Sequence, residues 1–564
     1  MSNEKNSNVY GIDLGTTYSA IAFINEYGKA EVIQNSDSES VTPSVVFFES
    51  PTNITVGTNA KSAGNAGPEA AGRVVDFVKR QMSSESWKFM ADDKQYGPVE
   101  ISSFILKRLV EDAQKTGGHD VKNVVITCPA YFGELERLRT RQAGELIGLN
   151  VLEILDEPVA AAINYGLEEA NTKGKNVIVY DLGGGTFDAT VISIGADQTK
   201  TEISVVCTDG DHQLGGKDWD DRIVQYYISE FQEKTDVDIM QGDPQEVHET
   251  LYDLRINAER NKKTLTTRND VSYRVTFDGS KASISLTREK FDEMTVDLLE
   301  RTITLTDKVL EMAKERGVSK IDAFLLVGGS TWMPQVEAKI IEKYSATLGI
   351  KPVYFDVNEA VAKGAAKEAE IITIKKALLG DEASKGDSAP PPTEASIQKV
   401  AIASGKTVQE VKDIINTTTK KVATKSYGIE ALVTDSSGKE SVKNSNLIFK
   451  QTSVPIVVKK SFSIHDDDSY SLPLIVYAND EMNEIVDLEM CTKVGEVLME
   501  LPQKLDSGMP LDIQFELTQE GKLKLYAYDP THRQTKEAEF TPEGALTDEQ
   551  MQEAKKQTGM LKVT

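Results

Sequence analysis

A chain of 564 residues is longer than one hydrophobic core supports, because single cores stop growing near ~300 residues, so we expect at least two domains. Acidic residues outnumber basic ones by 89 to 63, and the formal charge of −26 repels phosphate backbones and anionic lipid headgroups. Neither nucleic acid nor a membrane is therefore expected as a partner. No apolar run has the length of a signal peptide or of a bilayer span, which predicts a soluble, cytoplasmic protein.

Cysteine and histidine are few and scattered. The three cysteines are Cys128, Cys207 and Cys491, which suits reduced thiols better than a disulfide framework. The five histidines form no H-x-x-x-H pair. We therefore predict no disulfide, no metal cluster of these residues and no histidine chemistry.

The first two thirds of the chain alternate between two kinds of pattern. From Val9 to about Ile372, apolar strand-like runs such as VVITC and VLEIL are separated by helical patterns such as ISSFILKRLVEDAQK. This alternation predicts an α/β architecture, which we assign to residues 1–373.

A change of composition follows this region. The stretch GDEASKGDSAPPPTEAS contains small, charged and proline residues, which cannot bury enough surface to fold alone. Next comes ASIQKVAIASGKTVQEVKDIINTTTKK, in which apolar residues recur at helical spacing after Thr407, a plausible N-cap. We predict an extended linker with one or two short helices over residues 374–425.

The last part of the chain has the pattern of strands. Runs such as GIEALV, VPIVVKKSFSI and KLKLYAY are separated by polar turns such as DSSGKE, so we predict an all-β sandwich over residues 426–545. Residues 546–564 offer one short helix.

Two segments of the α/β region match each other. Tyr10 to Ile24 reads YGIDLGTTYSAIAFI, and Tyr180 to Ile194 reads YDLGGGTFDATVISI. Both read as strand, glycine turn with threonine, strand. This repeat predicts a duplicated lobe, with two equivalent hairpins that face each other across a cleft.

The residues of each hairpin suit the binding of phosphate. Glycines let backbone N–H groups approach an anion, and threonine hydroxyls add donors. Asp13 and Asp181 end their strands beside the turns, where a carboxylate can hold the water shell of Mg²⁺. One such motif could equally be an ordinary hairpin, but two copies with an aspartate before each turn favour the phosphate site.

Six segments resemble, in order and spacing, the DnaK-type heat-shock chaperones; they read GIDLGTTYSAIAF, CPAYFGELERLRTRQAGELIGL, ILDEPVAAAINYGL, DLGGGTFD, DGDHQLGGKDWD and LLVGGSTWMPQV. The resemblance covers nearly all of residues 8–370. The wider actin and sugar-kinase superfamily shares only the phosphate hairpins and a weaker adenosine motif, so CPAYF and DEPVAAA favour the chaperones. The resemblance implies two actin-like lobes that close on ATP or ADP with Mg²⁺, with K⁺ as a further candidate cation.

The same resemblance assigns roles in ATP hydrolysis. Lys79, in DFVKRQ, matches the lysine that neutralises transition-state charge, although by itself it reads as a solvated helix lysine. Glu157, in DEPVAAA, matches the carboxylate near the metal and the attacking water; alone it could be an acid at a helix N-terminus. The catalytic candidates are Lys79, Glu157, Asp13, Asp181 and Thr186, with Asp13 and Asp181 holding the metal through water.

The nucleotide-binding candidates come from both hairpins and from later segments. On the turns they are Gly15, Thr16, Thr17, Tyr18, Gly183, Gly184, Gly185, Asp188, Gly215 and Gly216. The segment AERNKKTLTT resembles the family's nucleoside helix, which places Glu259 and Lys262 on the ribose and Lys263 and Thr266 by the base. These four share one helical face, which could also be a plain charged surface. The turn on the other side of the base supplies Gly328, Gly329, Ser330 and Trp332, and the later segment DVNEAV supplies Asn358.

Three positions depart from the family pattern. Trp332 stands where arginine is usual, Asn358 where aspartate is usual, and Lys217 where glutamate is usual. An indole can still stack on adenine, so these changes bear on nucleotide affinity and exchange. Pro129 and Arg137 match a proline and an arginine that relay nucleotide state; otherwise they are a strand end and a surface helix residue.

The second domain resembles the family less closely. SYGIEALV and NLIFKQTSVP resemble strands of the family's peptide-binding sandwich, but no leucine-rich LLLD run precedes them. The resemblance implies a groove for extended peptide, for which Leu472 and Leu474 are candidates, although such strand residues are usually core. Only LTDEQMQEAKKQ corresponds to the family's helical lid, so lidless paralogues of the HscC kind are the nearest comparison.

Three functions are considered, and the intact set Asp13, Lys79, Glu157, Asp181 and Thr186 favours the first. The first is an ATP-dependent chaperone for unfolded or extended polypeptides, assisted by a J-domain co-chaperone and an exchange factor. The second is a nucleotide-binding interaction module with little turnover, which holds one partner protein. A small-molecule kinase is disfavoured by the β-rich second domain.

Overall fold

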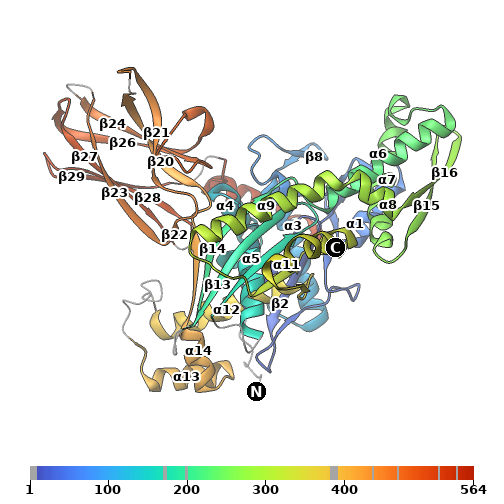
Figure 1. Ribbon diagram of the computed structural model, residues 1–564, viewed down its shortest axis with the longest axis horizontal. Helices are drawn as coiled ribbons and strands as arrows, with labels where there is room; N and C mark the ends of the chain where they lie inside the picture. Colours follow the sequence, from blue (N-terminus) through green and yellow to red (C-terminus); the bar gives the residue numbers. More distant parts are fainter. Residues whose placement is uncertain are drawn as a thin grey trace.

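Two α/β lobes and a β-sandwich make up the described part of the chain (Figure 1). The computed structural model describes residues 9–168, 174–196, 201–380, 391–434, 437–465, 469–518, 521–540 and 544–564. None of the helices within these ranges combines the length and the apolar character needed to cross a bilayer.

Lobe I contains the first glycine hairpin. Its main sheet consists of β1 (Val9–Asp13), β2 (Tyr18–Ile24), β3 (Ala30–Val32), β4 (Thr42–Pro43), β10 (Asn123–Cys128) and β11 (Asn150–Asp156), in the order β11-β10-β1-β2-β3 with β4 paired to β2. A smaller sheet and a hairpin contain β5 (Val46–Ser50), β6 (Asn53–Val56), β7 (Val74–Val75), β8 (Phe89–Ala91) and β9 (Lys94–Tyr96). The helical elements are α1 (Thr58–Ala63), η1 (Gly64–Ala66), α2 (Pro68–Ala71), η2 (Val78–Gln81), α3 (Pro98–Gly117) and α4 (Glu134–Leu146).

Lobe II repeats this plan around the second hairpin. Its sheet contains β12 (Lys175–Leu182), β13 (Phe187–Ala196), β14 (Thr201–Asp211), β17 (Ala323–Val327) and β18 (Pro352–Tyr354), and a separate hairpin contains β15 (Asp270–Phe277) and β16 (Ser280–Thr287). The helical elements are α6 (Gly216–Thr235), η3 (Ile239–Gln241), α7 (Pro244–Leu265), α8 (Arg288–Met294), α9 (Val296–Glu315), η4 (Gly329–Trp332), α10 (Pro334–Ile340), η5 (Ile341–Ser345) and α11 (Ala346–Leu348).

Two crossing helices join the lobes: α5 (Glu157–Glu168) and α12 (Ala360–Leu379). They approach so closely that a Cβ atom at Gly364 would overlap the Ala160 carbonyl group, which explains the run of small residues in both helices. Helix α12 extends past the domain boundary expected at residue 373, because its apolar face continues and Ile374 packs on the next helices.

The expected linker is more ordered than its composition indicates. It contains α13 (Glu394–Ser404) and α14 (Val408–Ile415), which pack on α12, and the strand β19 (Thr417–Val422). Thr407 caps α14 as expected: its hydroxyl accepts a hydrogen bond from Glu410 N at 3.1 Å, and the Glu410 carboxylate accepts one from Thr407 N at 2.7 Å. The acidic stretch 381–390 lies outside the described residues.

The β-sandwich begins at Ser426 and contains two sheets. One sheet has β20 (Ser426–Thr434), β21 (Glu440–Ile448), β24 (Ser469–Asn479), β25 (Ile485–Val486) and β26 (Thr492–Leu505); the other has β23 (Ile456–Ser463), β27 (Pro510–Leu517), β28 (Leu523–Asp529) and β29 (Gln534–Glu539). The remaining elements are β22 (Ser453–Val454) and η7 (Leu488–Met490), and then α15 (Asp548–Gly559) and β30 (Lys562–Val563). The strand β19 lies between β14 of lobe II and β22, so one sheet continues from lobe II into the sandwich.

Candidate functional site

A cavity of about 750 Å³ lies between the two lobes. Most residues that the motifs single out line it: Asp13, Gly15, Thr16, Thr17, Tyr18, Lys79, Glu157, Asp181, Gly183, Gly184, Thr186, Gly216, Glu259, Lys262, Lys263, Thr266, Gly328, Gly329, Ser330, Trp332 and Asn358. The lining does not include Gly185, Asp188 or Gly215, which lie behind the residues that line the cavity. The cavity therefore gathers side chains from segments that are far apart in sequence.

The two glycine hairpins meet directly across this cleft. A Cβ atom at Gly184 would overlap the Thr17 side chain, and one at Gly185 would overlap Thr16. Behind them, a Cβ atom at Gly215 would lie 2.5 Å from Gly185 N. Only glycine permits this approach, so the threonines of lobe I and the glycines of lobe II face one shared space.

Acidic side chains crowd the floor of the cleft around one lysine. Asp13 and Asp181 stand at the ends of β1 and β12, and Glu157 begins α5. Lys79, in η2, is 4% exposed and forms an ion pair with Glu157. Asp188 lies at the start of β13 and is also buried.

This cluster carries more negative than positive charge. Burial and the neighbouring Glu157 raise the pKa of Asp13 to about 7, against the lowering effect of Lys79. The same causes raise the pKa values of Asp181 and Asp188 well above the usual range. One carboxylate oxygen of Asp188 has no hydrogen-bond partner among the described residues. Such a site suits a ligand that brings positive charge with it.

Helix α7 supplies a charged wall. Glu259 accepts a hydrogen bond from the Tyr18 hydroxyl at 2.9 Å and pairs with Lys263 at 2.8 Å. It also forms an ion pair with Lys61 of α1, which ties lobe I to lobe II. Burial alone would raise the pKa of Glu259, but Lys61 and Lys263 lower it far below its usual value.

The other two predicted residues of α7 lie differently. Lys262 is buried; its Nζ donates to the Gly216 carbonyl at 2.6 Å and pairs with Asp220 at 2.9 Å. Thr266 follows the last residue of α7, and its hydroxyl donates to the Lys263 carbonyl at 2.7 Å. Lys262 therefore supports the start of α6, which bonds the second glycine turn, as well as lining the cavity.

An aromatic pair borders the far end of the cleft. The Trp332 ring stacks on Tyr354 with 4.6 Å between centroids and 7° between planes, and Trp332 is 48% exposed. Gly328 precedes it with a φ of 83°, and a Cβ atom there would lie 2.5 Å from Asp181 Oδ1. Because Tyr354 covers one face of the indole, only its other face is free for a planar ligand.

Two cleft contacts lack any signal in the sequence. Lys61 stands in TNAKSA and Arg80 directly follows Lys79, and neither spacing distinguishes them from surface residues. Arg80 Nε donates to the Gly185 carbonyl at 2.8 Å, and Arg80 pairs with Asp218 at 2.6 Å. Both residues therefore bridge the two lobes.

A sequence profile of the Hsp70 protein family matches residues 9–381. The chain belongs to the Hsp70 family. It is 40% identical over 390 residues to proteins named chaperone protein DnaK from Thermotoga petrophila and Thermotoga maritima, and 39% identical over 394 residues to the one from Thermosipho africanus. Each match covers 68% of this chain and 61% of the relative.

These matches confirm the DnaK-type resemblance and the actin-like α/β fold of the lobes. The profile ends at residue 381, before α13, α14, β19 and the sandwich. The chain spans about 61% of the length of these relatives, and its sandwich lies outside the residues that the profile matches.

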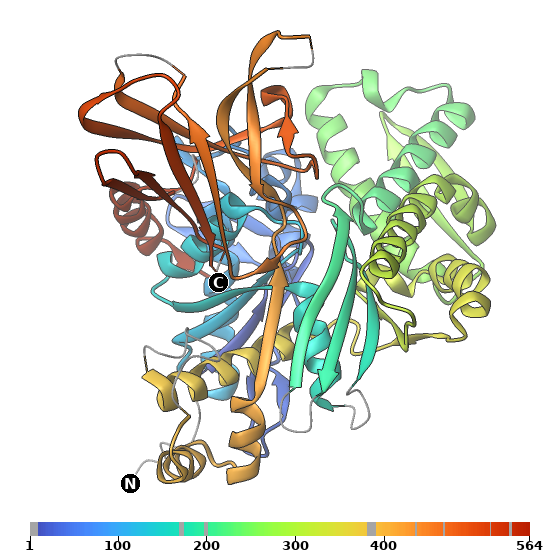
Figure 2. The same cartoon turned by 60° about the vertical axis from the view of Figure 1, so that its left-hand side comes forward.

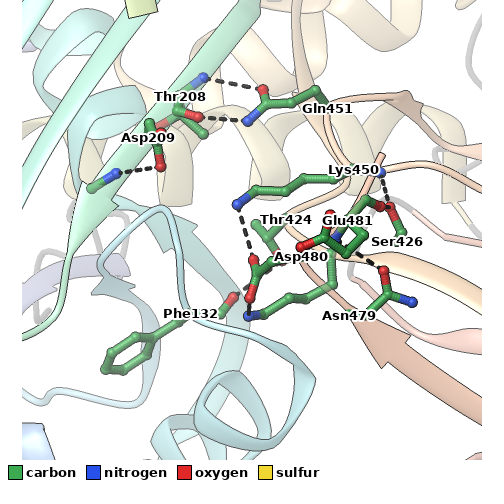
Figure 3. A network of polar contacts seen from close by, with 12 residues as sticks. Phe132, Thr208, Asp209, Thr424, Ser426, Lys450, Gln451, Asn479, Asp480 and Glu481 are labelled. Carbon is green, nitrogen blue, oxygen red and sulfur yellow. Dashed lines mark hydrogen bonds and ion pairs between the residues drawn. The ribbon is translucent and has the colours of Figure 1, made fainter. Parts of the chain in front are cut away.

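The predicted relay residues of this Hsp70 chain lie near the contact between lobe I and the segment that leads into the sandwich. Arg137 of α4 forms an ion pair with Asp156, the residue before Glu157, and its Nε donates to the Phe132 carbonyl at 2.9 Å. The Thr424 hydroxyl, between β19 and β20, donates to the same carbonyl at 3.4 Å (Figure 3). Pro129 directly follows β10 and begins this loop, so both relay candidates lie in it or against it.

The sandwich contacts lobe II through a side-chain amide that bonds to the main chain of β14. Gln451 accepts a hydrogen bond from Thr208 N at 3.1 Å and donates to the Thr208 carbonyl at 2.5 Å, as Figure 3 shows. Arg316 Nη1 donates to the Gln451 carbonyl at 2.9 Å. On the linker strand, buried Lys421 forms an ion pair with Glu153 of β11. Glu153 of β11 and the main chain of Thr208 in β14 thus hold the linker strand and the sandwich.

Of the two predicted groove residues, Leu474 is buried and Leu472 is partly buried. Leu474 is 4% exposed and lies in the sandwich core, and Leu472 packs against that core. Both point inward because residues at alternate positions of β24 share a face, and Val476 on that face is fully buried. The prediction is therefore wrong for Leu474, whereas Leu472 keeps some exposed surface and stays a candidate.

Proposed function

We propose that the chain binds and hydrolyses ATP with Mg²⁺ between its lobes, and that nucleotide state controls the binding of extended apolar polypeptide by the sandwich. The observation that carries this proposal is the contact between the two glycine turns over a buried cluster of carboxylates with one lysine. Turns of this kind present N–H and hydroxyl donors to phosphate oxygens. The name of the relatives, chaperone, supports the second half of the proposal.

Asp13 and Asp181 are the proposed holders of Mg²⁺, through its bound water. Their raised pKa values and the unpartnered oxygen of Asp188 fit a cation that relieves the excess negative charge. Among the described residues, no three acidic, histidine or cysteine side chains converge closely enough to hold a metal ion directly. When bound, Mg²⁺ would neutralise negative charge on the phosphates. Asp188 is a candidate contact for K⁺ as a second cation.

Side chains of the protein are proposed to take different roles in ATP hydrolysis. Lys79 lies where its ammonium group can stabilise charge that develops on the transferred phosphoryl group. Glu157, which accepts from Lys79, is the proposed acceptor for the attacking water and its proton. Thr16, Thr17 and Thr186 are proposed phosphate donors. Burial of Lys79 and Glu157 strengthens these interactions, because water screens them little.

The adenosine is proposed to lie between α7 and Trp332. Lys263 and the free face of Trp332 would hold the base from two sides, through a cation–π contact and stacking. Glu259 and Lys262 are proposed to face the ribose, with Ser330 and Asn358 nearby. The cavity that these residues line supports this assignment.

An exposed apolar face of the sandwich is a better candidate for client binding than Leu472 and Leu474. Leu432 and Val442 are direct neighbours on β20 and β21, and Leu498 of β26 lies on the same outer face; their exposed fractions are 38%, 49% and 48%. We propose that extended apolar segments bind here. A J-domain co-chaperone and an exchange factor are proposed as partners from the family membership alone.

The deciding experiment measures Mg-ATP binding and single-turnover hydrolysis, with and without an extended apolar peptide. Hydrolysis that the peptide accelerates supports the coupled chaperone. Hydrolysis that is indifferent to peptide contradicts the coupling. Tight binding without hydrolysis supports the alternative, a nucleotide-binding module that holds a partner, and the absence of ATP binding contradicts both.

A further inference from the structure

The segment 544–564 leaves the sandwich and becomes part of lobe I. Its helix α15 packs against α3 and α4, and Figure 2 shows this dark red helix beside the blue and cyan elements of that lobe. The last described residue of the sandwich before it, Phe540, packs in the sandwich core. Phe540 therefore belongs to the sandwich, and Gly544 contacts lobe I.

The end of this segment completes a sheet of lobe I. Strand β30 pairs in parallel with β6, with Lys562 opposite Asn53 and Val563 opposite Ile54. Lys562 N donates to the Thr52 carbonyl at 2.9 Å, and Thr564 N donates to the Ile54 carbonyl at 2.8 Å. Val56 N donates in return to the Thr564 carbonyl at 2.8 Å. This pairing gives β6 a second neighbour beside β5.

Two side chains of α4 hold the start of the segment by its backbone. Arg139, which is 4% exposed, donates to the Gly544 carbonyl at 2.7 Å from Nη2 and at 3.1 Å from Nε. Gln142 donates to the Leu546 carbonyl at 2.7 Å and accepts from Leu546 N at 3.1 Å. The contact is thus fixed at residue 544.

Apolar side chains of the segment belong to the lobe I core. Leu561 and Val563 are 3% and 2% exposed and lie in the cluster that contains Phe48 and Ile54. Ala554 of α15 is buried in the same cluster. Between the two buried side chains, Lys562 is exposed. The burial pattern is that of an internal strand face and not of a surface contact.

We propose that segment 544–564 is a permanent anchor of the sandwich on lobe I, so the sandwich is held at both of its ends. The four peptide steps from Phe540 to Gly544 reach about 14 Å when fully extended. Without the anchor, release of β19 would leave the eleven steps from Ile415 to Ser426, which reach about 40 Å. The anchor therefore limits how far the sandwich moves from lobe I when the linker strand detaches.

Hydrogen exchange on the unmodified chain tests the anchor without any substitution. The amides of Lys562 and Thr564 should exchange as slowly as those of β5 and β6, with Mg-ATP, with Mg-ADP and without nucleotide. Exchange of these amides together with β20 to β29, or their loss of protection in one nucleotide state, would overturn the proposal.

Distance measurements test the mechanical consequence. Spin labels are attached at two exposed positions, Glu49→Cys on lobe I and Glu537→Cys on the sandwich. The background chain carries Cys491→Ser, which removes the one cysteine that is not buried, and Lys421→Asp is added to release β19. The distance distribution should extend by no more than about 14 Å. Adding Leu561→Asp and Val563→Asp should extend it towards about 40 Å, whereas the matched variant Lys562→Ser should not. Equal distributions with and without the two aspartates would contradict the anchor.

Discussion

The nucleotide cleft and the junction with the sandwich both bury charged side chains, but they balance them differently. In the cleft, Asp13, Asp181 and Asp188 share one lysine and have raised pKa values. At the junction, Lys421 pairs with Glu153 and Arg137 pairs with Asp156. Buried charge that the protein leaves unmatched therefore marks where a ligand enters, and matched charge marks where two domains close on each other.

One junction residue breaks this pattern. Glu134, at the start of α4, is partly exposed as a residue, yet both of its carboxylate oxygens are buried without a hydrogen-bond partner among the described residues. Tyr427 of β20 lies beside it, in the wall of a small cavity that Arg137 also lines. Glu134 is thus an exception to the contrast between cleft and junction.

The largest effect is expected at the junction. Lys421→Met should weaken docking of β19 by about 3–5 kcal/mol, because Glu153 then stays buried without its partner. The measurement is the opening free energy of the β19 amides from hydrogen exchange. The double variant with Glu153→Gln should recover most of the loss.

A neighbouring lysine provides the control for this prediction. Lys420 pairs with Glu202 at the surface, at 2.8 Å, and is 52% exposed on its side chain. Lys420→Met should therefore cost about 0–1 kcal/mol. Equal effects at the two positions would show that the buried pair does not hold the linker strand.

The next effect concerns turnover in the cleft. Lys79→Ala should slow single-turnover ATP hydrolysis by a factor on the order of 10²–10³, while Mg-ATP still binds, because the side chain acts on charge that develops in the transition state. Lys94→Ala, on the exposed β8–β9 hairpin, should leave the rate unchanged. A Lys79→Ala chain that hydrolyses ATP at the original rate would remove this residue from the mechanism.

Docking of the sandwich should depend on pH through Glu134. Burial, opposed by Arg137, raises the pKa of Glu134 from 4.5 to about 8. The docked state therefore binds more protons than the released state in this window, so docking is strongest near pH 4.5 and weakens as the pH rises to about 8, by up to ~1.4 kcal/mol per pH unit.

Substitution of Glu134 tests the predicted direction of this pH dependence. Glu134→Gln should flatten the pH dependence of β19 and sandwich protection in hydrogen exchange, and it should strengthen docking at neutral pH. Glu136→Gln, on the same helix, should keep the original dependence. Docking of the original chain that strengthens between pH 5 and 8 would contradict the assignment.

The smallest effect is expected at the base. Trp332→Ala should weaken Mg-ATP binding about fivefold, or ~1 kcal/mol, because it removes one stacking surface. Trp332 is also the most exposed of the described tryptophans, so its fluorescence should change when nucleotide binds. A Trp87→Phe chain should retain that change. Unaltered affinity in Trp332→Ala would place the base elsewhere.

The cleft could be predicted from the sequence because its function demands particular residues at particular turns. The two glycine hairpins carry a local signal, whereas Lys79 and Glu157 were identified through the family resemblance, and the structure brings all of them together. Gly185 and Gly215 instead face protein atoms, which the motif alone does not distinguish from facing a ligand.

The junction was less predictable because its contacts are short and distant in sequence. Strand β19 has the sequence TTTKKV, with no apolar alternation, and it pairs with β14 about two hundred residues earlier. Strand β30 has two residues, which is too few for any periodicity. Leu474 was misassigned because an apolar strand residue looks the same whether it faces a groove or a core.

The double hydrogen bond between Gln451 and Thr208 has an evolutionary consequence. Gln451 contacts main-chain atoms of Thr208, which every residue type except proline presents alike. Substitutions of side chains along that edge of lobe II can therefore accumulate without loss of this contact, whereas the amide on the sandwich cannot vary. The side chain that this contact requires thus lies on the sandwich and not on lobe II. Related chains should therefore preserve Gln451 more strictly than Thr208.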